Sequence, residues 1–180
     1  MQHPNTETKT NTGLQSTDIV DLILKDHEPL KKLIKIMKDS DKELSERKAA
    51  FEEFAPVLIA HAKPEELVLY TFMKRDEELR EEAFEGDVEH TLADQLLEEC
   101  KRTDDEDLLG ARIKVLAELV EHHIEEEEEE LLPDFKKNSE HRDRIKLGEK
   151  FLKLKIDYLA AGDDNVIPDP KKQKEERLRH

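Results

Sequence analysis

A histidine–glutamate pattern that occurs twice is the feature that most constrains how this chain can fold. Each copy has one isolated histidine, then a second histidine 34 or 33 residues later, with a glutamate four positions after the second. The residues are His27, His61 and Glu65 in the first copy and His90, His123 and Glu127 in the second. The first histidines of the two copies are 63 residues apart, and the second histidines are 62 apart. Because internal repeats reflect repeated structural units, each copy is expected to form a similar helical hairpin.

Apolar residues recur in steps of three and four around these histidines, which is the spacing of one face of an α-helix. The stripe around the first histidine is Val20, Ile23, His27, Leu30, Ile34 and Met37. We expect helices over about 17–38, 43–74, 87–103, 104–132 and 139–160, with a short helix and turn over 75–86 that ends in Gly86. Pro56 and Pro64 remove backbone hydrogen bonds, so a kink or loosened turn is expected near His61, and Pro133 is expected to limit the fourth helix.

This pattern predicts an all-α fold, an up-down-up-down four-helix bundle with an additional C-terminal helix. Charged residues make up 42% of the 180-residue chain, with 5 glycines and no tryptophan, which suits long amphipathic helices better than sheets. We expect a disordered N-terminal tail over 1–15, the bundle over 16–135, the C-terminal helix over 136–161 and a mobile charged tail over 162–180. The fifth helix is expected to pack across the bundle or to form an interface between two copies of the chain.

Composition excludes several classes of protein. The net charge of −16 argues against nucleic acid or an anionic membrane surface as a partner. The single cysteine, Cys100, excludes an intramolecular disulfide framework. No stretch resembles a signal region or a membrane span, so a cytoplasmic location is expected.

The chemistry follows from the inward positions of the repeated residues. On a helix, residues four apart share one face at about 5–6 Å, so each second histidine and its glutamate address the same space. A carboxylate on a buried stripe is costly unless it is paired or bound to metal. Imidazole with carboxylate suits iron, manganese or zinc rather than calcium or magnesium. Four histidines and two glutamates exceed what one tetrahedral zinc needs, and they fit two metals, each with two histidines, bridged by both glutamates.

Other polar residues near the pattern leave alternatives open. Glu66 and Glu128 recur in both copies, either as hydrogen-bond partners of the site or as exposed residues. Asp94 is either an additional ligand or an acceptor for a histidine N–H. His122 points about 100° away from the apolar stripe and is expected to face solvent or to support the site from outside. Cys100 belongs either to the core or to a redox function.

The chain resembles the hemerythrin-like (HHE cation-binding) family over roughly residues 16–135. The matching elements are Asp26-His27, His61-x3-Glu65-Glu66 running to Leu69-Tyr70, Glu89-His90, and His123-x3-Glu127-Glu128 running to Leu132-Pro133. The resemblance implies a bundle that holds a non-haem di-iron centre, with manganese or zinc as lesser alternatives. It implies one iron on His27 and His61, a second on His90 and His123, and bridges from Glu65 and Glu127.

The resemblance also implies a small diatomic or peroxide ligand. The oxygen carriers of this family have a further histidine one turn after the third-helix histidine, where this chain has Asp94. They also use aspartate, one position further on, in place of Glu127. These departures predict irreversible reaction with oxygen rather than oxygen transport. The expected function is iron binding with handling or sensing of oxygen, nitric oxide or peroxide. The alternatives are a peroxidase- or catalase-like or iron-cluster-repair enzyme, and a metal-free bundle that acts through its surface.

Overall fold

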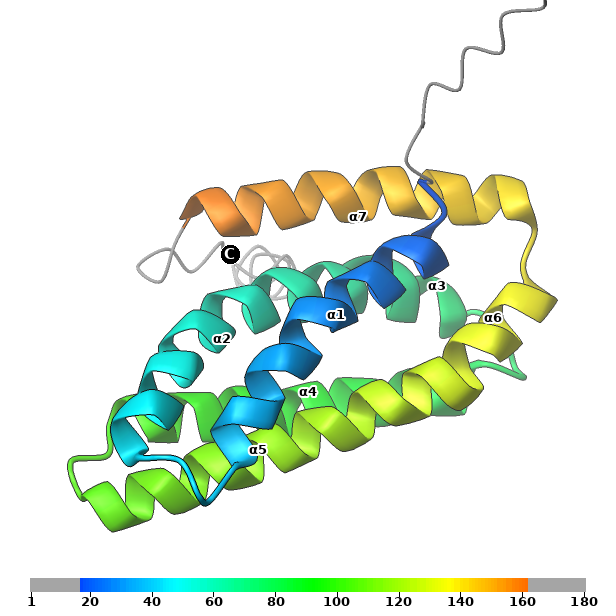
Figure 1. Cartoon of the computed structure of the whole chain (residues 1–180). Helices are drawn as coiled ribbons and strands as arrows, with labels where there is room; N and C mark the ends of the chain where they lie inside the picture. Colours follow the sequence, from blue (N-terminus) through cyan, green and yellow to red (C-terminus); the bar gives the residue numbers. More distant parts are fainter. Residues whose placement is uncertain (1–16, 162–180) are drawn as a thin grey trace, which may run out of the picture.

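The computed structural model describes residues 17–161, and within this range the chain forms five helical rods and no strand (Figure 1). The rods are α1 (Ile19–Lys38); α2 (Leu44–Glu65) continued by η1 (Glu66–Tyr70) and α3 (Thr71–Met73); α4 (Arg80–Lys101); α5 (Glu106–Glu126) continued by η2 (Glu127–Leu131) and α6 (Leu132–Asn138); and α7 (His141–Ala161). The predicted all-α bundle with an additional C-terminal helix is confirmed. The expectations of a disordered tail over 1–15 and a mobile tail over 162–180 concern residues outside the described range.

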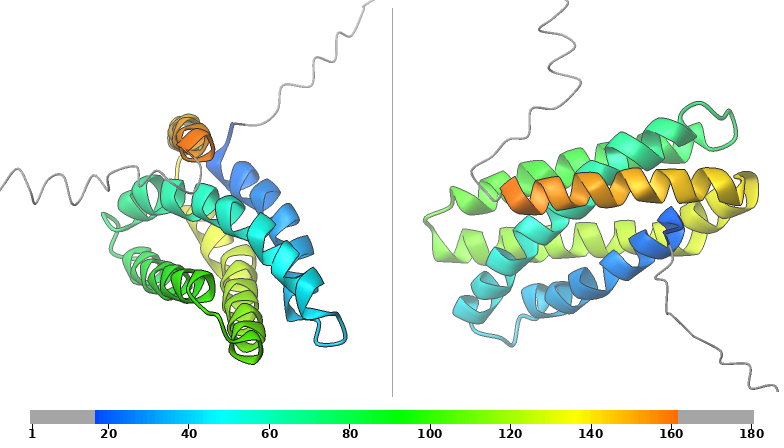
Figure 2. Two further views of the ribbon diagram at one scale, coloured as in Figure 1. Left: turned by 90° about the vertical axis from the view of Figure 1, so that its left-hand side faces the viewer. Right: turned by 90° about the horizontal axis from the view of Figure 1, so that it is seen from above.

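The first four rods close a bundle, and the fifth lies on its outside. Helix α1 packs against α2 and α5, while α4 packs against α5 and η1 (Figure 2). Helix α7, orange in Figure 1, runs across α1 and α2 on the side away from α4. Packing across the bundle is one of the two positions expected for the fifth helix, and an interface between two copies stays a prediction. No helix in the described range is both long and apolar enough to cross a bilayer.

Two apolar clusters fill the bundle and leave a polar layer between them. The larger cluster joins Leu30–Met37 of α1 to Ala50–Leu58 of α2 and to the parts of α4 and α5 beside their connecting turn. The smaller cluster gathers the start of α1, the η1–α3 and η2–α6 segments, and Phe151 of α7. In the rods of α1, α2 and α4 the repeated histidine lies between the stretches that enter the two clusters, and in the α5–η2 rod only Ile124 of the larger cluster lies beyond His123. The repeated polar residues are therefore enclosed by apolar packing at both ends of the bundle.

A short π-helical segment follows the histidine in both hairpins. The first, η1, begins directly after Glu65 and lies near the loosened turn that Pro64 predicts. The second, η2, begins at Glu127 with no proline before it. The prediction that Pro133 limits this rod is wrong, because α6 carries the helix on to Asn138. Proline is tolerated there because it follows directly on the π-helical turn of η2, where the hydrogen-bond register of the helix changes.

Helix α4 begins earlier than the sequence predicts. The segment over 75–86 was expected to end in a turn at Gly86, but the helix already starts at Arg80 and Gly86 lies inside it. A Cβ added at Gly86 would lie 2.6 Å from the ring and hydroxyl of Tyr70. Gly86 therefore leaves room for the buried side chain of Tyr70 and does not end a helix.

Helix α7 is held against the start of α1 by a close backbone contact and a buried ion pair. A Cβ at Gly148 would lie 1.8 Å from the carbonyl oxygen of Thr17, so only glycine permits this approach. The Nε of Arg144 donates to Oδ2 of Asp18 at 2.8 Å. Phe151 is fully buried beneath the helix. These contacts fix α7 over one side of the polar layer.

We predict that Gly148→Ala destabilises the protein, because the new methyl group meets backbone that cannot move aside without undocking α7. The free energy of unfolding should fall by about 2 kcal/mol or more, as measured by urea denaturation. Gly110→Ala is the matched control, since its Cβ would make ordinary contacts at 3.5 Å and 3.6 Å. Alanine inside a helix should there raise stability by about 0.5–1 kcal/mol. Equal effects at the two positions would contradict the proposed docking contact.

Candidate metal centre

The six residues of the repeated pattern come together in one buried layer across the bundle. They are His27 on α1, His61 and Glu65 on α2, His90 on α4, His123 on α5 and Glu127 at the start of η2. None exceeds 5% exposure, and the two glutamates are 0% and 1% exposed. All six come together at the middle of the bundle, as the repeat predicts, while their role as ligands stays a prediction.

The layer divides into two groups of donor atoms, each with the three atoms within 4.8 Å of one another. One group is His27, His61 and Glu127, and the other is Glu65, His90 and His123. Each glutamate also lies between the two groups. Oε2 of Glu65 is 3.3 Å from Nε2 of His61 and 3.9 Å from Nε2 of His90. Oε2 of Glu127 is 3.2 Å from Nε2 of His27 and 3.7 Å from Nε2 of His123. This geometry suits two cations that share both carboxylates.

Several buried polar atoms of the layer have no hydrogen-bond partner. Among them are both oxygens of Glu65, Oε2 of Glu127 and the Nε2 atoms of His27 and His61. A buried polar atom left unpaired costs about 1–3 kcal/mol, and native proteins rarely carry several in one place. Bound cations would satisfy these atoms together, and imidazole with carboxylate is a donor set that suits iron. The residues present therefore fit a two-metal site.

An outer carboxylate faces the Nδ1 atom of each histidine. The distances are 2.9 Å for His27 to Glu128, 3.8 Å for His61 to Asp26, 3.3 Å for His90 to Glu66 and 2.6 Å for His123 to Glu89. The arrangement repeats in both hairpins, because each acid adjoins a residue of the inner layer in sequence. A carboxylate that accepts the Nδ1 proton fixes the ring and turns Nε2 toward the centre as an acceptor. Glu66 and Glu128 are therefore partners of the site histidines, at 3.3 Å from His90 and 2.9 Å from His27, and not merely exposed residues.

Lysines neutralise three of these four outer carboxylates. Lys31 binds Glu128 at 2.7 Å, Lys63 binds Glu66 at 2.8 Å, and Lys155 of α7 binds Asp26. Burial acts to raise the pKa of each of these acids, but the hydrogen bonds to its histidine and lysine lower the pKa overall. The outer carboxylates therefore stay ionised and remain acceptors for the ring protons.

The inner layer carries more acid than it can ionise without a cation. Burial raises the pKa of Glu65 well above its usual value, and the charge of Glu127 raises it further. Burial acts the same way on Glu127, but His123 and His27 outweigh it and lower the pKa of that carboxyl. Burial also lowers the pKa of His61 to about 4, so this imidazole stays neutral and able to ligate. A cation between the glutamates would displace the proton from Glu65.

Tyr70, which ends one of the matching sequence elements, also reaches this layer, although the α-helical period does not place it there. Its fully buried hydroxyl donates to Oε1 of Glu127 at 2.8 Å and lies 3.5 Å from Nε2 of His123. In an α-helix, a residue five positions after Glu65 would point about 140° away from it. The π-helical turn of η1 contains more residues than an α turn and brings Tyr70 inward. The residue of the sequence that matches this inward position of Tyr70 is Gly86 on the facing helix, which leaves room for the tyrosine ring.

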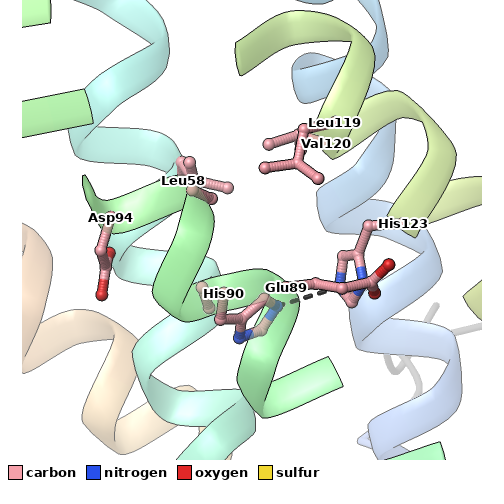
Figure 3. Close-up of a pocket in the computed structure, with 9 residues that line it drawn as sticks. Leu58, Glu89, His90, Asp94, Leu119, Val120 and His123 are labelled. Atoms are coloured by element: carbon pink, nitrogen blue, oxygen red, sulfur yellow. Dashed lines mark hydrogen bonds and ion pairs between the residues drawn. The ribbon is translucent and has the colours of Figure 1, made fainter. Parts of the chain in front are cut away.

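The structure keeps three other candidates away from the inner layer. Asp94 is 40% exposed and forms an ion pair with Lys63, and Figure 3 shows it apart from the His90–His123 pair. His122 is 64% exposed and pairs with Glu126 at 3.2 Å. Cys100 lies in the larger apolar cluster, and burial raises the pKa of its thiol to about 11. Asp94 therefore pairs with a lysine in place of either expected partner, His122 faces solvent, and Cys100 belongs to the core.

Comparison with known proteins agrees with this geometry. A family profile described as "Hemerythrin HHE cation binding domain" matches residues 18–135, a range that holds all six residues of the inner layer and the four rods of the bundle except the last three residues of α6. Searches of curated proteins and of solved structures gave no match. The domain is thus of a cation-binding type.

We predict that His123→Ala loses at least one of the bound metal ions, whereas His122→Ala keeps most of both. The reason is that His123 is buried in the inner layer and His122 faces solvent. Elemental analysis of the reconstituted variants, with circular dichroism as a check on folding, makes the comparison. If His122→Ala lost the metal and His123→Ala retained it, the helical phase on which the layer rests would be refuted.

Proposed function

The chain belongs to the hemerythrin HHE cation-binding domain family, and on this basis we propose that it is a non-haem di-iron protein whose centre takes up oxygen, nitric oxide or a peroxide. The observation that carries the proposal is the layer of four imidazoles and two buried carboxylates with unpaired atoms. The same atoms argue against a metal-free bundle, since unpaired buried carboxylates are costly. An iron pair, when bound, supplies electrons and exchangeable coordination positions for such ligands.

A small pocket beside His90 and His123 supports uptake of a small ligand. Its walls are mostly apolar, formed by Leu58, Ala62, Ala93, Leu119 and Val120 (Figure 3). Its volume is about 10 Å³, which is close to the room that one water-sized molecule needs. A pocket of this size and polarity favours a diatomic molecule or a peroxide over an organic substrate.

The other half of the layer is closed by bulky side chains. Three positions after the first histidine of each copy, the first hairpin has the fully buried Leu30 and the second has the much smaller Ala93. Phe151 of α7 packs edge-on against His61 at a ring separation of 6.4 Å. The sequence alone favours an open coordination position on both metals. The packing of Leu30 and Phe151 favours ligand access only from the side of His90 and His123.

Tyr70 supplies a proton-bearing group next to this side of the layer. Burial raises the pKa of its hydroxyl, and the nearby Glu127 raises it further, so the proton stays on oxygen. The hydroxyl orients Glu127 through its hydrogen bond. It also stands close enough to His123 to hydrogen-bond to a molecule bound beside that ring.

The donor set favours irreversible oxidation over oxygen transport. Carriers of this family have a histidine at the position of Asp94, but here Asp94 is held by Lys63 at the edge of the pocket. The donors of this half would then be His90, His123 and the shared glutamates, which leave two positions of a six-coordinate metal free, or one where a solvent bridge joins the two metals.

We predict that the anaerobic di-ferrous protein is oxidised by oxygen and does not return to the reduced state. The unoccupied positions allow the bound molecule to react further instead of leaving intact. Absorption spectra recorded before oxygen, after oxygen and after prolonged argon flushing test this. A spectrum that reverted fully to its colourless starting form under argon would make the protein a carrier and defeat this part of the proposal.

We predict that Ala93→Leu abolishes binding of azide, as a probe of the pocket, while both iron ions remain. The larger side chain fills the pocket in the way that Leu30 fills the other half. Ala50→Leu is the matched control, because Ala50 is equally buried at 5% exposure but lies outside the pocket lining. Azide titration by absorption and iron analysis are the measurements. Unchanged azide affinity in Ala93→Leu would show that ligands reach the centre elsewhere.

A further inference from the structure

A cavity between α4 and the α5–η2 rod opens onto the inner layer from a strongly acidic surface. We call its outer glutamates, Glu82, Glu85, Glu126 and Glu130, the acidic vestibule. We propose that the acidic vestibule captures divalent metal cations and delivers them to the buried layer through Glu89, His123 and Glu127. This inference rests on the proposed two-metal centre and adds the route by which that centre is loaded.

The cavity connects the surface to the layer. It has a volume of about 60 Å³, enough for a few water molecules or a partly hydrated ion. Its inner wall includes His123 and Glu127, which belong to the layer itself. Glu127 is 1% exposed, and its Oε2 atom has no hydrogen-bond partner. An unpaired, buried carboxylate oxygen at the inner end of the cavity is a destination for a cation that enters from the outer end.

The charges of the acidic vestibule lack nearby neutralising partners. Glu82 has a buried oxygen without a hydrogen-bond partner. Burial raises the pKa of Glu82, and the neighbouring Asp134, Glu130 and Glu85 raise it further by repulsion. The one basic side chain paired with the vestibule in the described range is His122, 3.2 Å from Glu126. Like charges held together in this way are costly for folding, and a bound cation would relieve them.

At the remaining approaches to the layer, lysines neutralise the carboxylates. The outer carboxylates of three histidines are covered by Lys31, Lys63 and Lys155. Among the described residues, Glu89 pairs with His123 and with no lysine, and it lines the cavity. An incoming cation therefore meets neutralised ion pairs at three corners of the layer and, at the fourth, glutamates that no lysine of the described range neutralises. This difference selects the acidic vestibule as the route.

Electrostatic steering gives the proposal a kinetic signature. A cleft lined by one sign of charge raises the association rate of an oppositely charged ion by about 10–1,000-fold. Salt screens that attraction, with a Debye length of about 10 Å at 0.1 M ionic strength. Loading through the vestibule should therefore be fast at low salt and slower at high salt. The final affinity depends mainly on the inner layer and should change much less.

The test compares cation uptake by the metal-free full-length chain and two variants of equal net charge. The vestibule variant carries Glu82→Gln, Glu85→Gln, Glu126→Gln and Glu130→Gln. The control carries Glu52→Gln, Glu53→Gln, Glu118→Gln and Glu149→Gln, four exposed sites outside the cavity lining. Anaerobic stopped-flow mixing with Co²⁺, followed by its visible absorption, gives the loading rate, and equilibrium titration gives the stoichiometry.

The vestibule variant should load at least about tenfold more slowly than the wild type at low salt, and still bind two Co²⁺ ions. The control should load at close to the wild-type rate, and only the vestibule variant should lose most of the salt dependence. Equal rates for the vestibule variant and the control, with two ions bound in both, would overturn the route and leave the proposed function standing. A wild type that binds no Co²⁺ would overturn both. Salt-independent loading of the wild type would also refute the route, whatever the variants do.

Discussion

Two fully buried carboxylates at the centre of a helical bundle are the constraint on which this structure depends. Glu65 and Glu127 lie among four imidazoles, in a layer closed at both ends by apolar clusters. Without a cation they cannot both ionise, and the pKa of Glu65 rises while that of Glu127 falls. An outer carboxylate faces the Nδ1 atom of each ring, and those of His27 and His123 are hydrogen-bonded to it, which directs the Nε2 atoms inward. A cation in the layer would relieve the cost of burying Glu65 and Glu127.

The two hairpins repeat this chemistry but differ in what surrounds it. In the first half, α7, Phe151 and Leu30 close the site, and Lys155 covers an outer acid. In the second half, Ala93 leaves a small apolar pocket, and an acidic cavity reaches the layer from the other direction. A symmetric donor set thus lies in an asymmetric enclosure. Under the proposed function, two metals with equivalent donors would therefore differ in their access to ligands, and the second half would serve both ligand uptake and metal loading.

The sequence predicted the inner layer well because its signals are local and periodic. A histidine inside an apolar stripe and a glutamate four positions later specify one face of a helix, and the repeat specifies two hairpins. Tyr70 could not be predicted in this way, because it reaches the layer only through a π-helical turn that breaks the α-helical period. The sequence around Gly86 predicts the end of a helix, whereas in the structure this glycine leaves room for Tyr70, a residue 16 positions away that a local pattern does not include. The pocket and the cavity depend on tertiary packing, for which the period of a single helix carries no information.

The most direct test is the anomalous diffraction of crystals of the iron-loaded protein at the iron absorption edge. The account predicts two peaks within the polar layer of each chain. One should lie beside His27 and His61 and the other beside His90 and His123, with Glu65 and Glu127 next to both. A single peak, or iron bound only at surface carboxylates, would contradict the claim that the buried layer is a two-metal site.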